Sequence, residues 1–459
     1  MSAPAVPRVV AEEVPPVGLT TDAMPDVAPD EHLFALSDTA ALLLAETQAT
    51  PCFAYRLDVA RDRFRALRAA LPKRVHLAYA VKSNPGPPLL AELAGLGAWF
   101  DCASAGEVAA VAAAREAAGA ETNRTGTTAS GPTVSSPAVS GRMVFAGPAK
   151  SEADLRAALA AGARIQVDGI EDVQRLADWH AGPEPLPVNV RVHPLSGISE
   201  TASIIGGSGP SAFGVDEEEL DGFVAACAEY PTVRLTGLQV FSASNQLDAD
   251  ALVANHRTAL GIGERLQSLL GRPLDLIDLG GGLGIPYAVG SPELDIAALG
   301  GGLAALLRDN PWFTGSLVLE PGRWLSGPTG VYLTRVVRVK QSRGTTFAIL
   351  EGGINHLLRP LMTGQSFPAR AVRSGRHEDT TDWTDASRAT EHSGERTTYT
   401  LAGPLCTSLD RVGTAELPAL EPGDLLVFGQ AGAYGFTQAM TNFLSHPVPE
   451  QHWLSVGQR

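Results

Sequence analysis

The stretch HLAYAVKSNP, at residues 76–85, is a short apolar run that ends in a lysine and a turn. Its length and its β-favouring side chains predict a strand. Seven more runs of this kind follow along the chain, at 99–104, 143–147, 164–169, 188–194, 235–244, 274–281 and 316–322. The sequence therefore predicts eight strands between residues 76 and 322.

The segments between these strands are mostly rich in Ala, Leu, Arg and Glu with helical spacing, as at 151–161 and 248–270. Strands that alternate with helices predict a parallel sheet. Eight such units are the number that closes into a (β/α)8 barrel with an outer ring of helices. We therefore expect a TIM-like α/β barrel over residues 59–322.

After residue 322 the pattern changes to β-rich segments without helices between them, at 330–340, 346–350, 397–403 and 424–428. This predicts a C-terminal all-β domain over 323–459. Residues 33–58, which include TPCFAYRL at 50–57, are expected to join it as a strand or a helix. Residues 1–32 are expected to be a disordered extension, and two polar stretches, 121–142 and 370–396, to be inserted loops.

Composition excludes several classes of protein. A net charge of −15 argues against nucleic acid or an anionic membrane as the partner, because both favour a basic face. No apolar run approaches the roughly 20 residues of a membrane helix. Four widely spaced cysteines without a CxxC pair suggest neither a disulfide framework nor a metal site. We expect a cytoplasmic protein that acts on small molecules.

The ends of the predicted strands carry the residues that suggest chemistry, since barrel enzymes place their sites there. Lys82 ends an apolar strand, where desolvation would favour the neutral amine that attacks an aldehyde. The alternative is a surface lysine beside a strand. The sequence DLGGGLGIPY holds glycines 280–282, which let backbone N–H groups approach an anion or simply form a flexible turn.

Two further strand ends add polar groups to the same expected rim. FSASNQ offers the hydroxyl of Ser244 to a phosphate and the aromatic face of Phe241, and LEPGR places Glu320 and Arg323 at the mouth of the barrel.

Taken in order, these motifs resemble the ornithine/diaminopimelate/arginine decarboxylase family, whose barrel is of the alanine racemase type. The motifs are AYAVKSNP, WFDCASAGE, DLGGGLG, LEPGR, LLRP, GPLCTSLD and AGAY, in the family's order. The resemblance covers the chain from about residue 50 onward, apart from the two polar stretches. It implies a decarboxylase that uses pyridoxal 5'-phosphate.

The resemblance also implies a role for individual residues. Lys82 would carry the cofactor as a Schiff base, and Cys406 would reprotonate the substrate carbon from the neighbouring subunit of a homodimer. For Cys406 the alternative is a small buried side chain. The implied cofactor-binding residues are Lys82, Phe241, Ser244, Gly281, Gly282, Glu320, Gly322, Arg323 and Tyr434.

Glu320 bears on the type of reaction. A carboxylate beside the pyridine nitrogen keeps it protonated and makes the ring a strong electron sink. Racemases of this fold place an arginine there, so Glu320 favours decarboxylation. Arg191, in VRVHP, is either a contact near the cofactor ring or part of a salt bridge at the end of its strand.

Departures from the family pattern concern the substrate. Phe241 replaces the family's usual histidine on the cofactor ring, and Thr407 stands where relatives have an acidic residue that pairs with a distal ammonium. In LLRPLMT, Arg359 is kept, but Thr363 replaces a frequent tyrosine. The implied substrate-binding residues are Arg323, Arg359, Thr407 and Tyr434.

We infer a substrate whose far end is neutral or anionic, since a cationic tail would lose its partner. Within the family this resembles the branch of natural-product and cell-envelope pathways. That branch includes enzymes acting on a glutamyl group carried by an acyl carrier protein and enzymes acting on citryl-diaminopropionate. The alternatives are a diaminopimelate decarboxylase of lysine biosynthesis, a racemase, and an inactive regulatory relative that binds the cofactor.

Overall fold

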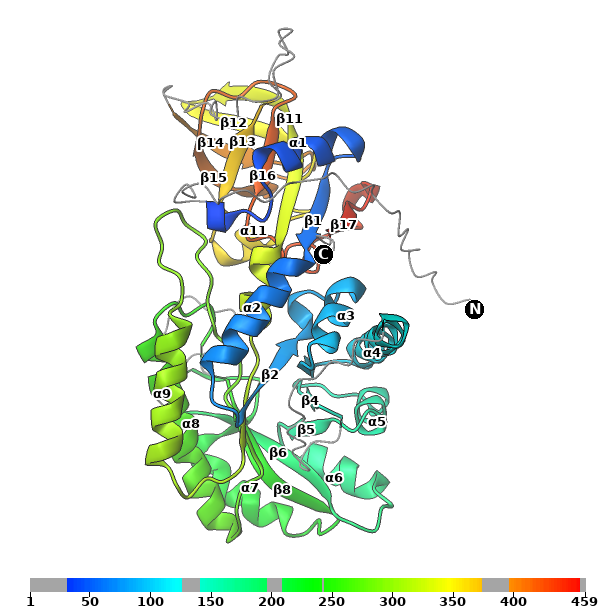
Figure 1. The fold of residues 1–459 in the computed structure, drawn as a ribbon, viewed down its shortest axis with the longest axis vertical. Helices are drawn as coiled ribbons and strands as arrows, with labels where there is room; N and C mark the ends of the chain where they lie inside the picture. The colour runs from blue at the N-terminus through cyan, green and yellow to red at the C-terminus, as the bar shows by residue number, and fades with distance from the viewer. Residues whose placement is uncertain (1–30, 126–140, 196–208, 242, 374–395, 455–459) are drawn as a thin grey trace.

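The structure is a computed structural model that describes residues 31–125, 141–195, 209–241, 243–373 and 396–454. It has two bodies, a barrel and a β domain, with helix α2 (Leu57–Ala70) lying between them (Figure 1). One apolar core runs through both, from Leu67 and Leu93 near the barrel to Tyr332 and Phe428 in the β domain.

Eight parallel strands form the barrel. In space they follow the order β5-β4-β3-β2-β10-β9-β8-β6, and the pairing of β5 with β6 closes the ring. Only β7 (Val215–Asp216) lies outside it, paired with the end of β6. Their bounds are β2 Val75–Ala80, β3 Trp99–Cys102, β4 Met143–Phe145, β5 Arg164–Val167, β6 Leu186–His193, β8 Val233–Val240, β9 Leu276–Asp278 and β10 Ser316–Leu319. All eight predicted strands are confirmed.

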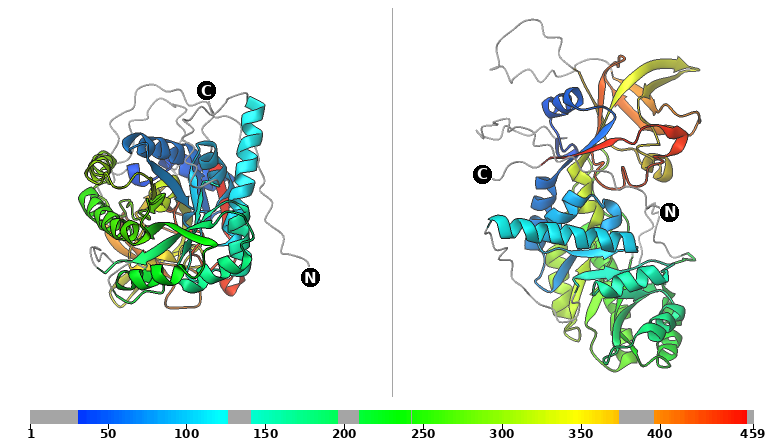
Figure 2. Two further views of the ribbon diagram at one scale, coloured as in Figure 1. Left: turned by 90° about the horizontal axis from the view of Figure 1, so that it is seen from below. Right: turned by 90° about the vertical axis from the view of Figure 1, so that its right-hand side faces the viewer.

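Helices surround these strands, as the view from below in Figure 2 shows. They are α3 Pro87–Gly95, α4 Ala105–Thr125, α5 Glu152–Ala160, α6 Ile170–Trp179, α7 Leu220–Cys227, α8 Ala249–Leu270 and α9 Ile296–Asp309. Local sequence sets their ends. Ser151 and Asp154 form a capping box that begins α5, and Gly271, with a φ of 64°, ends α8.

The β domain contains a second, eight-stranded sheet. Its strands are β1 Cys52–Arg56, β11 Gly330–Ser342, β12 Thr345–Leu350, β13 Ala369–Val372, β14 Thr397–Ala402, β15 Arg411–Leu417, β16 Leu425–Phe428 and β17 Glu450–Leu454. The early strand β1 pairs with both β11 and β17, so the expectation that 50–57 joins this domain as a strand is confirmed. The short helix α1 (Asp38–Thr47) packs on the same sheet through Ala41 and Ala45.

Two expectations about the insertions need correction. Residues 121–125 continue helix α4, and residues 370–372 belong to strand β13. The greater part of both stretches, together with residues 1–30, lies outside the described residues, and the predicted limits of the domains stay a prediction. Among the residues that the structure describes, no helix combines the length and apolarity needed to cross a bilayer.

Helix α9 contains three successive glycines that lie in different surroundings. A Cβ on Gly300 would overlap the carbonyl oxygen of Ala70, the last residue of α2, whereas a Cβ on Gly301 would meet open space. Gly300 therefore lets α9 pack directly against α2.

We predict that Gly300→Ala lowers the free energy of unfolding by roughly 1–3 kcal/mol, because the added methyl forces the two helices apart. Gly301→Ala is the matched control and should raise it by up to about 1 kcal/mol, since alanine favours the helix. Denaturant titration of both variants measures the difference. A shift of the same sign in the two variants would contradict this account of the packing.

Candidate active site

A cavity of roughly 510 Å³ lies between the C-terminal ends of the barrel strands and the β domain. Eleven of the residues singled out from the sequence line it. The barrel contributes Lys82, Arg191, Phe241, Ser244, Gly281, Gly282, Glu320, Gly322 and Arg323, and the β domain contributes Arg359 and Tyr434. Residues that follow different strands thus meet in one place, as the barrel architecture requires.

Lys82 lies in a single turn, Val81–Ser83, directly after β2, and its Nζ is 2.8 Å from Oδ2 of Asp101 on β3. Burial alone would lower the pKa of Lys82, but the charge of the adjacent Asp101 outweighs burial and raises it above the usual lysine value. The expectation of a neutral amine is therefore wrong for this arrangement. The ammonium form is favoured because β3 places a buried carboxylate beside it.

The turn that carries Lys82 is attached to the β domain. The backbone N–H of Tyr434 donates to the carbonyl of Ser83 at 2.8 Å, and the side-chain amide of Asn84 donates to the carbonyl of Gly432 at 2.9 Å. Tyr434 has a φ of 58°, a left-handed conformation that costs a non-glycine residue energy and persists only where its surroundings enforce it. These bonds fix the lysine relative to both bodies.

Two buried acids lie in the barrel beneath Lys82. Glu320 follows β10 and accepts a hydrogen bond of 3.2 Å from Gln239, while Asp278 ends β9 and accepts one of 2.6 Å from Gln166. Burial, together with the negative charges of Asp101 and Asp278, raises the pKa of Glu320 well above its usual value. Burial also raises the pKa of Asp278. Glu320 can therefore hold a proton in this interior.

The glycine loop after β9 offers free backbone donors. Gly282 has a φ of 102°, and a Cβ there would lie 2.9 Å from the carbonyl oxygen of Ala243; a Cβ on Gly281 would lie 2.8 Å from that of Glu320. Among the described residues, neither Gly281 nor Gly282 has an acceptor for its backbone N–H. Together with the nearby Arg323, these N–H groups form an anion site.

Arginines dominate the side of the cavity that faces the β domain. Arg323 donates to the hydroxyl of Tyr287 at 2.8 Å, and Arg359, at the start of α11 (Arg359–Thr363), donates to Gln438 at 3.1 Å. The two guanidinium groups lie 5.0 and 4.7 Å from the centre of the Tyr434 ring. Neither forms an ion pair with a carboxylate in the part of the chain that the structure describes. This side can therefore accept anionic groups.

Cys406 and Thr407 are the two predicted site residues that do not line the cavity of their own chain. They lie in the loop after β14, where Cys406 is exposed. Asp410 holds this loop by accepting from the backbone N–H groups of Ile354 and Leu405, each at 2.7 Å.

Sequence reasoning missed several lining residues, among them Asp101, Phe213, Gln239 and Gln438. For Asp101 a signal was present, because an acid near the end of an apolar strand next to the lysine strand must face the same rim. Phe213 and Gln438 lie in irregular segments, where no periodicity marks them.

Comparison with known proteins agrees with this geometry. Residues 57–327, more than half of the chain, match the family model described as pyridoxal-dependent decarboxylase, pyridoxal binding domain. The chain belongs to the pyridoxal-dependent decarboxylases. The resemblance seen in the sequence motifs is thereby confirmed.

Individual relatives differ in what they act on. The L-glutamyl-[BtrI acyl-carrier protein] decarboxylase of Niallia circulans is 28% identical over 87% of each chain. The 2-[(L-alanin-3-ylcarbamoyl)methyl]-2-hydroxybutanedioate decarboxylase of Staphylococcus aureus is 27% identical over 90% of this chain and 96% of its own. A diaminopimelate decarboxylase of Deinococcus radiodurans is 31% identical over 89% of this chain and 90% of its own.

Among solved structures, diaminopimelate decarboxylase from M. jannaschii in complex with L-lysine has a TM-score of 0.74 at 22% identity. The aligned region covers 91% of this chain and 89% of the M. jannaschii chain. That likeness concerns the fold alone.

The cofactor of pyridoxal-dependent decarboxylases, pyridoxal 5'-phosphate, fits the residues present. The free N–H groups of Gly281 and Gly282 and the guanidinium of Arg323 match a phosphate, and a Cβ at either glycine would clash with a backbone carbonyl, so this loop path requires glycine. A buried acid that can exchange a proton suits a pyridine nitrogen, and a primary amine suits an aldehyde.

We predict that Asp101→Asn speeds covalent loading of pyridoxal phosphate onto the apoprotein at neutral pH. Removing the carboxylate lowers the pKa of Lys82, and each unit raises the neutral, reactive fraction about tenfold. Stopped-flow absorbance between pH 6 and 9 measures the rate, with Lys82→Ala as the blank and Glu107→Gln as a control that removes another lining acid. An unchanged or slower rate in Asp101→Asn would show that Asp101 does not control this charge.

Proposed function

We propose that this decarboxylase acts on an amino acid or amino-acid conjugate whose far end is neutral or anionic. The observation that carries the proposal is Arg359, a buried guanidinium on the cavity wall without a carboxylate partner among the described residues. A second ammonium on the substrate would meet like charge there, whereas a carboxylate would gain a charge-assisted hydrogen bond.

Neutral groups near Arg359 support the same reading. The hydroxyl of Thr363 donates to the carbonyl of Arg359 at 2.9 Å and so stays within its own helix. Gln438 accepts from the Arg359 guanidinium at 3.1 Å, and the Tyr287 hydroxyl also hydrogen-bonds it, so both of these partners are uncharged. Thr407, the proposed counterpart from a second copy, carries no charge either.

Each site residue receives a role in this proposal. Bound pyridoxal phosphate supplies the electron sink that takes up the electron pair left when carbon dioxide departs. Lys82 would hold the cofactor, while Ser244, Gly322, Tyr434 and the glycine loop would surround its phosphate with Arg323. Phe241 would lie against the ring. Glu320 would hold a proton at the pyridine nitrogen, and its raised pKa supports that role.

Cys406 is proposed to donate the final proton to the substrate carbon from the partner subunit. It is exposed and lies outside the cavity of its own chain, so it can serve a site only in another copy. We therefore propose a homodimer with shared active sites. We also propose a cytoplasmic location, since all four cysteines are free, as is usual in a reducing compartment.

The names of the relatives suggest two forms of substrate. The Niallia circulans relative acts on a glutamyl group attached to a carrier protein, and the Staphylococcus aureus relative acts on a hydroxybutanedioate conjugate. Both substrates lack a distal ammonium. The second candidate function is diaminopimelate decarboxylation, which the relative at 31% identity favours. The unpaired Arg359 and the neutral Thr407 favour the first candidate.

Release of labelled carbon dioxide from a substrate panel separates the candidates. We predict turnover of glutamyl carrier protein or citryl-diaminopropionate, slow or no turnover of meso-diaminopimelate, ornithine and lysine, and none with Lys82→Ala. Efficient turnover of meso-diaminopimelate would show that Thr407 does not set specificity and would place the enzyme in lysine synthesis.

Arg359→Gln should raise KM for the preferred anionic substrate about 10- to 100-fold, the cost of one hydrogen bond to a charged group. The effect on kcat should be smaller, because the contact exists before and after decarboxylation. Arg338→Gln, an exposed arginine on β11, is the matched control. Equal KM values for Arg359→Gln and wild type would remove the main support for an anionic far end.

Shared sites predict complementation between two inactive variants. Lys82→Ala and Cys406→Ala, co-expressed in equal amounts, should recover about a quarter of wild-type activity, because about half of random dimers are mixed and each has one intact site. Recovery no greater than the sum of the separate variants would show that Cys406 does not act across the interface.

A further inference from the structure

Arg191 is a buried guanidinium on the cavity wall, at a point the proposed mechanism does not use. It lies on β6, is 9% exposed, and has no hydrogen-bond acceptor or carboxylate partner among the described residues. Its guanidinium lies over the ring of Phe213, with the guanidinium carbon 4.4 Å from the ring centre. Phe213 also lines the cavity, so this cation–π contact stabilises the guanidinium at the cavity wall.

Phe213 is in turn held through the residue that follows it. Gly214 has a φ of 76°, and a Cβ on it would lie 2.9 Å from the carbonyl oxygen of Arg191. Its backbone N–H donates to Oδ1 of Asp168 at 2.8 Å. The segment that carries Phe213 is therefore pressed against β6 and attached to a carboxylate at the end of β5.

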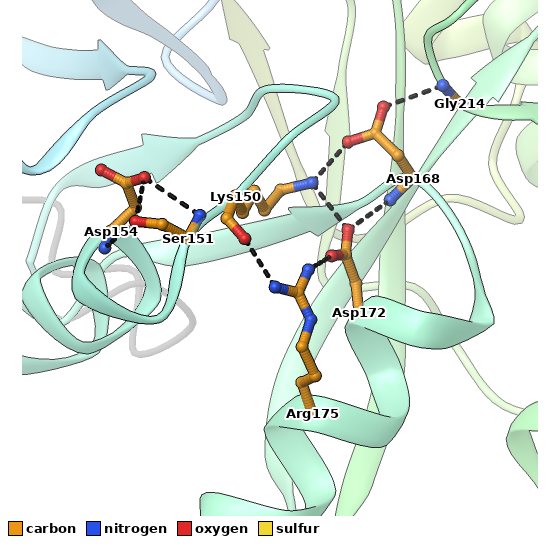
Figure 3. A network of polar contacts seen from close by, with 7 residues as sticks. All are labelled: Lys150, Ser151, Asp154, Asp168, Asp172, Arg175 and Gly214. Atoms are coloured by element: carbon orange, nitrogen blue, oxygen red, sulfur yellow. Dashed lines mark hydrogen bonds and ion pairs between the residues drawn. The ribbon is translucent and has the colours of Figure 1, made fainter.

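Asp168 belongs to a network of four charged side chains (Figure 3), of which Lys150, Asp168 and Asp172 are largely buried and Arg175 is partly exposed. The Nζ of Lys150 lies between Oδ2 of Asp168 and Oδ2 of Asp172, and its side chain is 1% exposed. Arg175 pairs with the other oxygen of Asp172 and also donates to the carbonyl of Lys150 at 2.6 Å. The network holds two positive and two negative charges and is thus neutral.

Lys150, Asp168 and Asp172 favour one arrangement, because displacing any of these buried charges would leave a desolvated charge without its partner. Asp168 is the member that reaches out of the network. One of its oxygens faces Lys150 and the other accepts from the backbone of Gly214. A shift of Lys150 would therefore move Asp168 and, with it, the segment that carries Phe213 on the cavity wall.

We propose that the Lys150–Asp168 ion pair is a positioning device that sets Phe213 and, through it, the free guanidinium of Arg191 toward an acceptor oxygen of the bound substrate. This inference rests on the proposed function insofar as the cavity is the substrate site. Lys150 and Asp168 are positioning residues, since neither lines the cavity.

A double-mutant cycle tests whether Asp168 acts through Phe213. In the wild-type background, Asp168→Ala should raise KM about tenfold, because it releases the Gly214 backbone. In the Phe213→Ala background, the same substitution should raise KM less than about twofold. Affinity for the amine product, measured by titration calorimetry, should change in the same pattern without any turnover. Equal effects of Asp168→Ala in both backgrounds would overturn the proposal.

Arg175→Met is the matched control within the network. It removes an ion pair of Asp172 but leaves the bond between Asp168 and Gly214, so it should lower the melting temperature while KM stays within about twofold of wild type. A KM rise in Arg175→Met as large as in Asp168→Ala would mean that the network acts only through stability.

Two measures keep the test independent of other outcomes. If Asp168→Ala does not fold, Asp168→Asn replaces it, since its single amide oxygen can accept from Gly214 or from Lys150 but not from both. The cycle uses whichever substrate the wild-type enzyme turns over in the panel. Turnover of diaminopimelate would therefore contradict the proposal of a substrate with a neutral or anionic far end. The coupling between Asp168 and Phe213 could still be measured with diaminopimelate as the substrate.

Discussion

The pairing of β10 with β2 is the constraint on which the site depends. The first and last strands of the barrel lie about 240 residues apart in sequence, yet Leu317 pairs with Val75 and Leu319 with Leu77. Parallel strands end at the same rim, so closure places Lys82, Asp101, Asp278 and Glu320 together above the barrel interior. Without this pairing the sheet would be open, and Asp278 at the end of β9 and Glu320 after β10 would be separated from the lysine.

Closure also divides the charges in the cavity. Asp278 and Glu320 come from the ends of the barrel strands, where burial and mutual repulsion raise the pKa of both carboxyls. Arg359 comes from the β domain, and Arg323 follows the last barrel strand on the side facing that domain. A single cavity can therefore hold a protonated ring nitrogen at one end and anionic groups at the other, which is the distribution of charge that a phosphorylated pyridine and an acidic substrate present.

Much of this was predictable from the sequence, for a physical reason. Each barrel strand is an apolar run, and residues such as Lys82 and Glu320 directly follow one, so periodicity locates both the strand and the site. Strands β13, β15 and β17 were missed because charged and polar residues interrupt them, so that none contains an apolar run. The charge of Lys82 depends on the register of β2 and β3, which brings Ala80 opposite Asp101. The link from Lys150 through Asp168 to Phe213 joins three separate segments, and no local pattern indicates it.

The bonds from Ser83 and Asn84 to residues 434 and 432 have a consequence for how such enzymes can be recombined. They join the lysine turn to two backbone groups of the β domain and to none of its side chains. The position of the lysine therefore depends on the backbone conformation at residues 432–434 more than on which side chains the β domain carries. A chimaera that joins this barrel to the β domain of a relative should keep its lysine in place wherever the donor chain repeats the left-handed turn at Tyr434. Where the donor lacks that turn, the reactive amine would lose its register with the barrel even though every side chain of the barrel is native.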